Sequence, residues 1–315
     1  MQRPYFKVGL VQKCLRSLTG YAPFRQHAAQ LAAKLYDPEA TVSREFTIDY
    51  HGLQYRGETR NRIDWCVFFL KNFAEAESKF VKGVHNFVRR KQETFVCYDI
   101  GAHVGQRTLP MATIATRVIA TEPAKGAAGR LREKLHANKL SHVSLFNVAF
   151  SDQDGNVEVD VLSPADFVLA RKDNPLLQGG FGSDFIQVVR GDRFIAKHQL
   201  PAPDFMRISS TSDLLGMLKG LHETLRAARP ILLIGRPASA SDKAINVEAL
   251  KAALYEDVQI STFSECLLSG AFALEPFNPR ARKLVCYPKD LERMAELEAC
   301  KRMSHRLKPE GAIQG

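Results

Sequence analysis

The stretch that decides the fold begins with Phe95-Val96-Cys97-Tyr98-Asp99-Ile100-Gly101-Ala102-His103-Val104-Gly105. A short apolar run ends in Asp99, a glycine bend follows, and residues 106–116 have the composition of a helix. A second apolar run, residues 117–121, ends in Glu122. This succession predicts a β-α-β unit, with a ligand site where the two parallel strands end.

The residue types in this unit indicate a class of ligand. Gly101 and Gly105 lack a Cβ, so the backbone can turn tightly and a ligand can lie against it. A carboxylate that ends the second strand can accept hydrogen bonds from two ribose hydroxyls, which is the position of Glu122. Asp99 ends the first strand and is placed to face an ammonium group.

The spacing of the glycines argues against a dinucleotide. The fingerprint G-x-G-x-x-G, started at Gly101, would need glycines at His103 and Gln106. A nucleoside with an amino-acid end and no phosphate suits the bend better, which indicates S-adenosylmethionine as the cofactor. The alternative is that strand, glycine, helix and acid form a generic α/β turn with no cofactor.

Further residues extend the pattern along the chain: Glu122-Pro123, Asn138, Asn147-Val148-Ala149-Phe150-Ser151-Asp152 and Gly155. Together with the glycine bend they resemble the FkbM-type S-adenosylmethionine-dependent methyltransferases. The resemblance covers about residues 45 to 234 and is strongest up to residue 161. That family usually has asparagine where this chain has His103.

The resemblance implies a fold and a domain plan. We expect an α/β protein, a Rossmann-like class I methyltransferase three-layer sandwich with a mostly parallel sheet and an antiparallel C-terminal hairpin strand. Residues 1–92 are expected to form an N-terminal helical and β-hairpin extension. Residues 93–288 are the expected methyltransferase domain, and residues 289–315 a C-terminal helix and tail.

Composition restricts the partners and the compartment. The chain has 315 residues, a formal net charge of +10 and six cysteines, with no C-x-x-C pair and no zinc spacing. The charge favours a polyanionic partner, such as an anionic membrane surface, an acidic glycan or nucleic acid, although a merely solvated basic surface also explains it. We expect reduced thiols, no metal, no signal peptide and a cytoplasmic protein, with peripheral contact to the inner face of a membrane as an option.

The N-terminal part of the chain suggests helices and one hairpin. Residues 1–40 read as helical, residues 46–55 as a β-hairpin and residues 61–91 as a helical region. The expected apolar anchors of the first helices are Leu15, Leu18, Leu31 and Leu35. An aromatic stripe in the third region predicts core packing rather than a ligand box; it comprises Phe69, Phe73, Phe80, Val84 and Phe87.

The rest of the chain alternates between predicted helices and strands. A helix buries Ala127, Leu131 and Leu135 and ends at Asn138, expected in the left-handed conformation. Residues 163–184 form either a loose surface loop or a lid beside the site. Strands are expected at 143–150, 157–161, 185–189, 204–208, 231–234 and 258–263, helices at 213–228, 242–255 and 289–306, and a closing hairpin between 266–277 and 284–287.

The resemblance also places the donor site. It implies that Asp99, Gly101, His103 and Gly105 line the methionine and ribose side of S-adenosylmethionine. Glu122, followed by Pro123, is expected to bind the ribose hydroxyls. Val148 and Ala149 are expected near the adenine.

The acceptor side departs from the family. After the fourth strand the family usually has acids where this chain has Ser209, Thr211 and Leu214, and another where it has Gly235. Ser209 and Thr211 can hydrogen-bond an acceptor but are poor bases near neutral pH. His103 and Asp204 remain as candidate bases. His103 is alternatively a polar residue that contacts only the cofactor, and Asp204 is expected to lie far from the site.

Three functions are compatible with the sequence. The first is S-adenosylmethionine-dependent O-methylation of a hydroxyl on a sugar, glycolipid or secondary metabolite. The second is a catalytically impaired methyltransferase-like protein that acts as a cofactor-binding or protein-interaction module. The third is an RNA methyltransferase, which rests on the charge alone.

Overall fold

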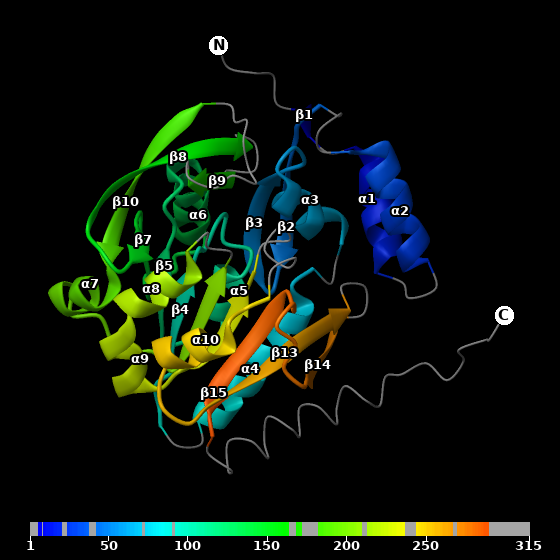
Figure 1. Ribbon diagram of the computed structural model, residues 1–315. Helices are drawn as coiled ribbons and strands as arrows, with labels where there is room; N and C mark the ends of the chain where they lie inside the picture. Colours follow the sequence, from blue (N-terminus) through cyan, green and yellow to red (C-terminus); the bar gives the residue numbers. More distant parts are fainter. Residues whose placement is uncertain are drawn as a thin grey trace.

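A computed structural model describes residues 6–7, 9–20, 24–37, 42–70, 73–89, 92–163, 168–171, 182–209, 213–236, 244–266 and 270–289. Its main sheet has eight strands in the order β14-β13-β15-β12-β11-β4-β5-β6 (Figure 1). Their bounds are β4 Val96–Ile100, β5 Arg117–Thr121, β6 Val143–Phe146, β11 Phe205–Ser209, β12 Ile231–Gly235, β13 Val258–Cys266, β14 Ala271–Glu275 and β15 Lys283–Pro288.

The direction of the strands confirms the predicted fold class. All neighbours from β6 to β12 are parallel, whereas β15 runs antiparallel to both β12 and β13. The edge strand β14 also runs antiparallel to its neighbour β13. A parallel sheet with a reversed strand inserted before its last parallel strand, as β15 is here, is the Rossmann-like class I methyltransferase architecture. The ligand-binding edge of such a sheet is the one at which the parallel strands end.

Helices cover both faces of this sheet and complete the three layers. Alternate strand residues point to opposite faces, so Cys97 and Phe205 join one core while Tyr98 and Met206 join the other. The first core is closed by α4 Glu75–Val88, α5 Thr108–Ala112 and α6 Lys125–Ala137. The second is closed by α7 Gly191–Lys197, α8 Leu214–Gly220, α9 His222–Ala228 and α10 Val247–Ala253.

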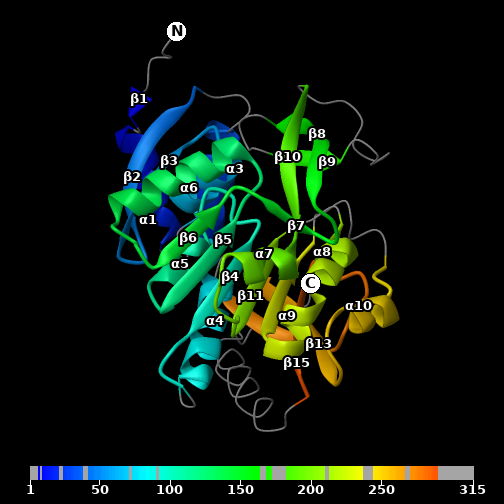
Figure 2. The ribbon, with the colours of Figure 1, turned by 90° about the vertical axis from the view of Figure 1, so that its left-hand side faces the viewer.

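A second, four-stranded sheet stands beside the main one, with the order β7-β10-β8-β9 (Figure 2). Its strands are β7 Ala149–Ser151, β8 Gly155–Ser163, β9 Val168–Arg171 and β10 Ser183–Arg190. The expected single strand over 143–150 is therefore wrong, because the chain leaves the main sheet after Phe146. The side-chain Nδ2 of Asn147 donates to the backbone carbonyls of Glu122 and Pro123 at 2.7 and 3.1 Å, and β7 then pairs with β10.

The described part of residues 1–92, the expected N-terminal extension, contains the predicted hairpin and four helices. Its elements are β1 Phe6–Lys7, α1 Leu10–Thr19, α2 Arg25–Leu35, β2 Arg44–Tyr50, β3 Leu53–Glu58 and α3 Arg62–Phe69, followed by α4. Ala74, at φ +62°, precedes α4 and separates it from α3. The aromatic stripe packs in the core as predicted, with Phe69, Phe80, Val84 and Phe87 buried and Phe73 packed against them.

The predicted anchors of α1 and α2 are mostly wrong. Leu15 is buried, but Leu18, Leu31 and Leu35 are 41%, 45% and 49% exposed. The two helices pack through other residues. In α2 the buried ones are the small Ala28 and Ala32, which let the helices approach closely and leave the large apolar side chains outside.

Three further expectations are corrected. Lys139, at φ +54°, takes the left-handed position expected of Asn138, whose side chain instead bonds Gln54 of β3. The helix over 213–228 is divided at Leu221 into α8 and α9. The closing hairpin joins β14 to β13, and β15 lies on the other side of β13. The expected terminal helix lies outside the described residues after Lys289.

Any side chain at Gly105 should lower the stability of the fold. Its φ is +89°, and an added Cβ would lie 2.4 Å from Cδ1 of the fully buried Leu131. We expect Gly105→Ala to lower the free energy of unfolding by about 2 kcal/mol or more, through strain and overpacking. Urea denaturation measures the change. Gly129→Ala is the control, because Gly129 lies within α6 with no atom within 4 Å of the added Cβ, and it should raise stability by about 0.5 kcal/mol. Equal effects of the two variants would contradict this account.

Candidate functional site

The glycine bend is fastened to the end of the neighbouring strand. The amides of Gly101 and Ala102 donate to the carbonyl of Thr121 at 2.9 and 3.0 Å. Gly101 and His103 have φ of +78° and +53°. A Cβ on Gly101 would lie 2.9 Å from the carbonyl oxygen of Ser209, so only glycine lets β11 end this close to the bend. The structure thus brings the predicted acceptor-side residue Ser209 next to the predicted donor loop.

Glu122 closes the bend from the end of β5. Its Oε2 accepts from the amide of His103 and its Oε1 from the amide of Ala124, both at 2.8 Å. The residue is 6% exposed. Burial raises the pKa of Glu122 to about 7, against the two backbone donors, which lower it. Near neutral pH this carboxyl therefore changes between its protonated and its ionised form.

The residues around Glu122 fit a nucleoside with free hydroxyls. An ionised carboxylate has about four lone-pair sites, and the amides of His103 and Ala124 use one on each oxygen. Each oxygen thus keeps the capacity to accept one hydroxyl. The hydroxyl of Thr121, the residue before Glu122, is also buried, without a hydrogen-bond partner in the described part of the chain.

Asp99 already has partners within the protein. It is fully buried, with Oδ1 bound by Nη1 of Arg207 at 2.7 Å and Oδ2 bound by the hydroxyl of Thr108 at 2.6 Å. Direct contact with an ammonium group would require one of these donors to move. In this structure Asp99 holds Arg207 beneath the bend, with Nη1 3.5 Å from the carbonyl of Gly101.

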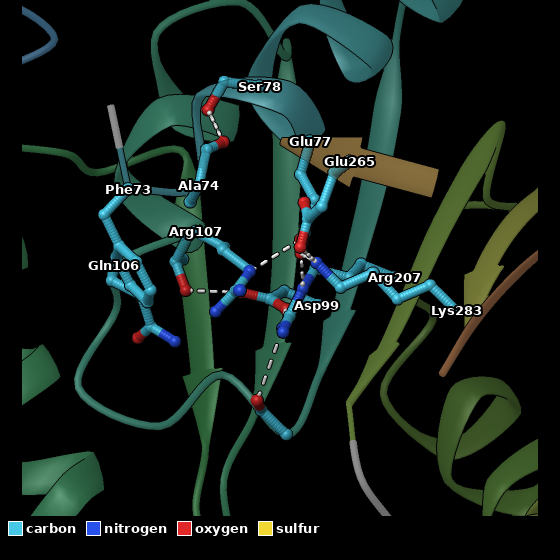
Figure 3. Close-up of polar contacts among 12 residues, drawn as sticks. Phe73, Ala74, Glu77, Ser78, Asp99, Gln106, Arg107, Arg207, Glu265 and Lys283 are labelled. Carbon is cyan, nitrogen blue, oxygen red and sulfur yellow. Dashed lines mark hydrogen bonds and ion pairs between the residues drawn. The ribbon is translucent and has the colours of Figure 1, made fainter. Parts of the chain in front are cut away.

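A buried cluster of charges lies beside Asp99 (Figure 3). Its centre is Glu77 of α4, which we group with its neighbours as the Glu77 network. Oε2 of Glu77 binds Nε of Arg107 at 2.6 Å and Nε of Arg207 at 3.3 Å, and Oε1 binds Nζ of Lys283 at 2.5 Å. Lys283 also pairs with Glu265. The network joins α4, the loop after the bend, and strands β11, β13 and β15.

The network balances its own charge. Burial disfavours the ionised form of Glu77, but Arg107, Lys283 and Arg207 outweigh it and hold the pKa of Glu77 well below its usual range. With Asp99 and Glu265 included, three carboxylates face three cations. The cluster therefore positions the carboxyl edge of the sheet without leaving an uncompensated buried charge.

The N-terminal extension also holds the bend from its other side. The hydroxyl of Tyr50 donates to the carbonyl of Gln106 at 2.8 Å. Nζ of Lys134, in α6, donates to the carbonyl of Val104 at 2.9 Å, lies 4.4 Å from the ring centroid of Tyr55 and 3.9 Å from Asp64. Burial lowers the pKa of Lys134 to about 8, although the nearby carboxylate opposes this. The hairpin and α3 are thus part of what shapes the loop.

The remaining predicted residues lie at opposite ends of the strands of the main sheet. Pro123 comes after Glu122, and its carbonyl accepts from Asn147. Val148 is buried in the core, and Ala149 begins β7, so both come after the end of β6. Asp204 precedes β11 at the opposite edge of the sheet, where it binds the amide of Val96 at 2.8 Å, as expected of a residue far from the site. The predicted acceptor-side residue Thr211 lies outside the described residues.

Sequence reasoning missed Glu77, Lys283, Glu265 and the role of Arg107. One signal was available, because Glu77 shares a helical face with Phe80 and Val84 and is thus an acid on an apolar stripe. Lys283 and Glu265 come from strands far along the chain, and no local pattern marks them.

The described residues offer neither a metal site nor a membrane span. No group of three or more His, Cys, Asp or Glu side chains among them is arranged to hold a metal ion. No described helix combines the length and the apolar character needed to cross a bilayer.

Comparison with known proteins gives structural likenesses only. No protein-family model and no curated protein matches the sequence. Similar solved structures include the methyltransferase FkbM from Methylobacillus flagellatus KT, at 18% identity and TM-score 0.41 over 62% of this chain and 43% of that one. A SAM-dependent methyltransferase from Agrobacterium tumefaciens is 10% identical, with a TM-score of 0.46 over 80% of this chain and 72% of that one. M. jannaschii TYW2 in complex with AdoMet is 14% identical, with a TM-score of 0.39 over 77% of this chain and 84% of that one.

These likenesses are weak in sequence and in superposition. The match with the Methylobacillus protein covers less than half of that protein's length. Because all three TM-scores are below 0.5, the strand order of the main sheet and the contacts of the glycine bend are the firmer indications of the ligand class.

Glu77 should be a major determinant of stability. Glu77→Gln leaves Arg107, Arg207 and Lys283 with one anion fewer in a buried place, so we expect the free energy of unfolding to fall by about 3 kcal/mol. Glu75→Gln, two residues earlier in α4, is the control. Its side chain is 31% exposed and lies 3.7 Å from Lys79, so its loss should cost less than about 0.5 kcal/mol. Thermal and urea unfolding of both variants measure the difference, and similar values would contradict the assignment.

Proposed function

We propose that the protein is an S-adenosylmethionine-dependent methyltransferase. The observation that supports this most directly is Glu122, which follows β5, accepts from the amide of His103 and keeps one acceptor site on each carboxylate oxygen. It stands at the carboxyl edge of a class I methyltransferase sheet, beside a bend with left-handed residues at Gly101, His103 and Gly105. This is where that architecture binds its ligand.

Each part of the donor has a proposed partner. Bound S-adenosylmethionine supplies an electrophilic methyl group on a sulfonium. Glu122 accepts the ribose hydroxyls, and the backbone from Gly101 to Gly105 lies along the methionine and ribose. Val148 and Ala149 border the adenine. Asp99 acts through Arg207, because both of its oxygens are already bound.

For the acceptor we propose a hydroxyl on a sugar, glycolipid or secondary metabolite. The sequence resemblance supports this class. Ser209, whose backbone carbonyl approaches Gly101 closely, is the proposed hydrogen-bond partner of the acceptor beside the donor loop, and this closeness supports the proposal. His103 is the proposed base, since histidine is a common general base in enzymes and the backbone of His103 already belongs to the bend.

A second candidate is a protein that binds the cofactor without transferring the methyl group. The engagement of Asp99 by Arg207 and Thr108 favours it, as does the presence of Ser209 where an acid is usual. In that case the donor loop serves to change the protein's shape or its interactions when the cofactor binds.

The pKa of Glu122 gives the proposed donor site a pH dependence. Below about pH 7 the carboxyl is protonated and loses part of its capacity to accept two hydroxyls. We expect affinity for S-adenosylmethionine to rise about tenfold between pH 6 and pH 8, in proportion to the ionised fraction of Glu122. Calorimetric titration at a series of pH values measures this. Glu122→Gln should bind weakly at every pH, and an unchanged affinity in that variant would refute the placement of the ribose.

Transfer of a labelled methyl group separates the two candidate functions. We expect transfer to a hydroxyl acceptor, detected by mass spectrometry over a panel of sugars and glycolipids. His103→Asn keeps a residue that tolerates positive φ, so it should preserve donor affinity while lowering kcat about 100-fold or more. Weaker donor binding with an unchanged kcat would make His103 a cofactor contact only. Donor binding without transfer to any acceptor would favour the non-catalytic protein.

A further inference from the structure

Helix α1 exposes much of its apolar side and buries several polar side chains, unlike an ordinary surface helix. Its buried side chains are Gln12, Leu15 and Thr19, and Arg16 reaches inward to the carbonyl of Phe68 at 2.5 Å. Its outward side carries Leu10, Val11, Cys14 and Leu18, with Leu10 77%, Val11 61% and Leu18 41% exposed. At 3.6 residues per turn these four fall within an arc of about 100°.

Helix α2 repeats the arrangement. Phe24, which caps the N-terminus of α2, and Leu31 and Leu35 within the helix are 59%, 45% and 49% exposed, and their helical spacing puts them on one side. We call these three residues and the four of α1 the apolar stripes. Seven exposed apolar or sulfur-bearing side chains on two adjoining helices form the kind of surface that marks an interaction site.

Cations predominate in the sequence that carries the stripes. Residues 1–36 contain six Lys and Arg and no Asp or Glu, and the first acid of the chain is Asp37, two residues after the end of α2. Lys13 and Lys34 are exposed on α1 and α2. Apolar side chains flanked by an excess of cations are the composition of a segment that lies in the interface of an anionic bilayer.

We propose that the α1–α2 hairpin docks the protein on the surface of a membrane that contains anionic phospholipids. The apolar stripes enter the boundary between head groups and acyl chains, and Lys13 and Lys34 contact the phosphates. Figure 1 shows α1 and α2 at the margin of the molecule, away from the main sheet. This leaves them accessible to a flat surface. The inference does not depend on methyl transfer, since none of these residues belongs to the donor site.

Co-sedimentation of the full chain with vesicles tests the proposal. We expect binding to vesicles with about one third phosphatidylglycerol, and about tenfold weaker binding to pure phosphatidylcholine. Leu10→Gln/Leu18→Gln should weaken binding to the anionic vesicles about tenfold. Both side chains are exposed, so the fold should be unaffected, which circular dichroism and thermal unfolding check.

Matched controls come from other parts of the surface. Phe185→Gln removes a side chain that is 59% exposed on β10 and should leave vesicle binding unchanged. Lys13→Gln/Lys34→Gln should weaken binding, whereas Lys197→Gln/Lys251→Gln, which removes the same charge from α7 and α10, should have a smaller effect.

Three results would overturn the proposal. One is no binding of the full chain to either kind of vesicle. Another is vesicle binding that Leu10→Gln/Leu18→Gln leaves intact, which would make the contact a purely electrostatic one. The third is a dimer in light scattering that the leucine variant converts to a monomer, together with no vesicle binding, which would show that a second copy covers the stripes.

Discussion

The ion pairs of Glu77 are the interactions on which the C-terminal ends of the parallel strands depend. Its carboxylate is buried, and it is held by cations from the donor loop, from β11 and from β15. A carboxylate in such a place is tolerated only because three positive groups surround it, and these groups in turn need it. Its helix belongs to the N-terminal extension, so the extension helps to determine the position of the residues that are expected to meet the cofactor.

The donor loop is shaped from several directions at once. Glu122 holds it from β5, Tyr50 from the hairpin and Lys134 from α6. Most of these contacts use backbone atoms of the loop, whereas the side chains of Ala102 and Val104 are fully buried and pack in the core. His103 binds Glu122 through its backbone amide and has a positive φ, a conformation that asparagine, the usual residue here in the family that the sequence resembles, also tolerates.

Local pattern was sufficient for some elements and insufficient for others. The β-α-β unit and the hairpin of residues 44–58 follow from apolar runs, glycines and turn residues, and both are present. The reversed C-terminal strand was expected from the family resemblance, and the hairpin read from local pattern at this end of the chain was wrong. The Glu77 network could not be derived in this way, because Glu77 and Lys283 are 206 residues apart and meet only when the sheet forms. The prediction that the leucines of α1 and α2 are buried failed for another reason. Helical periodicity identifies an apolar side but does not say whether the protein or something else covers it.

The place of β15 in the sheet has a consequence for biosynthesis. This strand inserts between β12 and β13, both of which precede it in the chain. While the ribosome is still producing residues before Lys283, β12 and β13 each present an open hydrogen-bonding edge, and Glu77 and Glu265 still lack the ammonium group that later joins them. The nascent protein thus completes its eight-stranded sheet only after β15 has been synthesised, and until then these edges are the sites at which chaperones would have to prevent association.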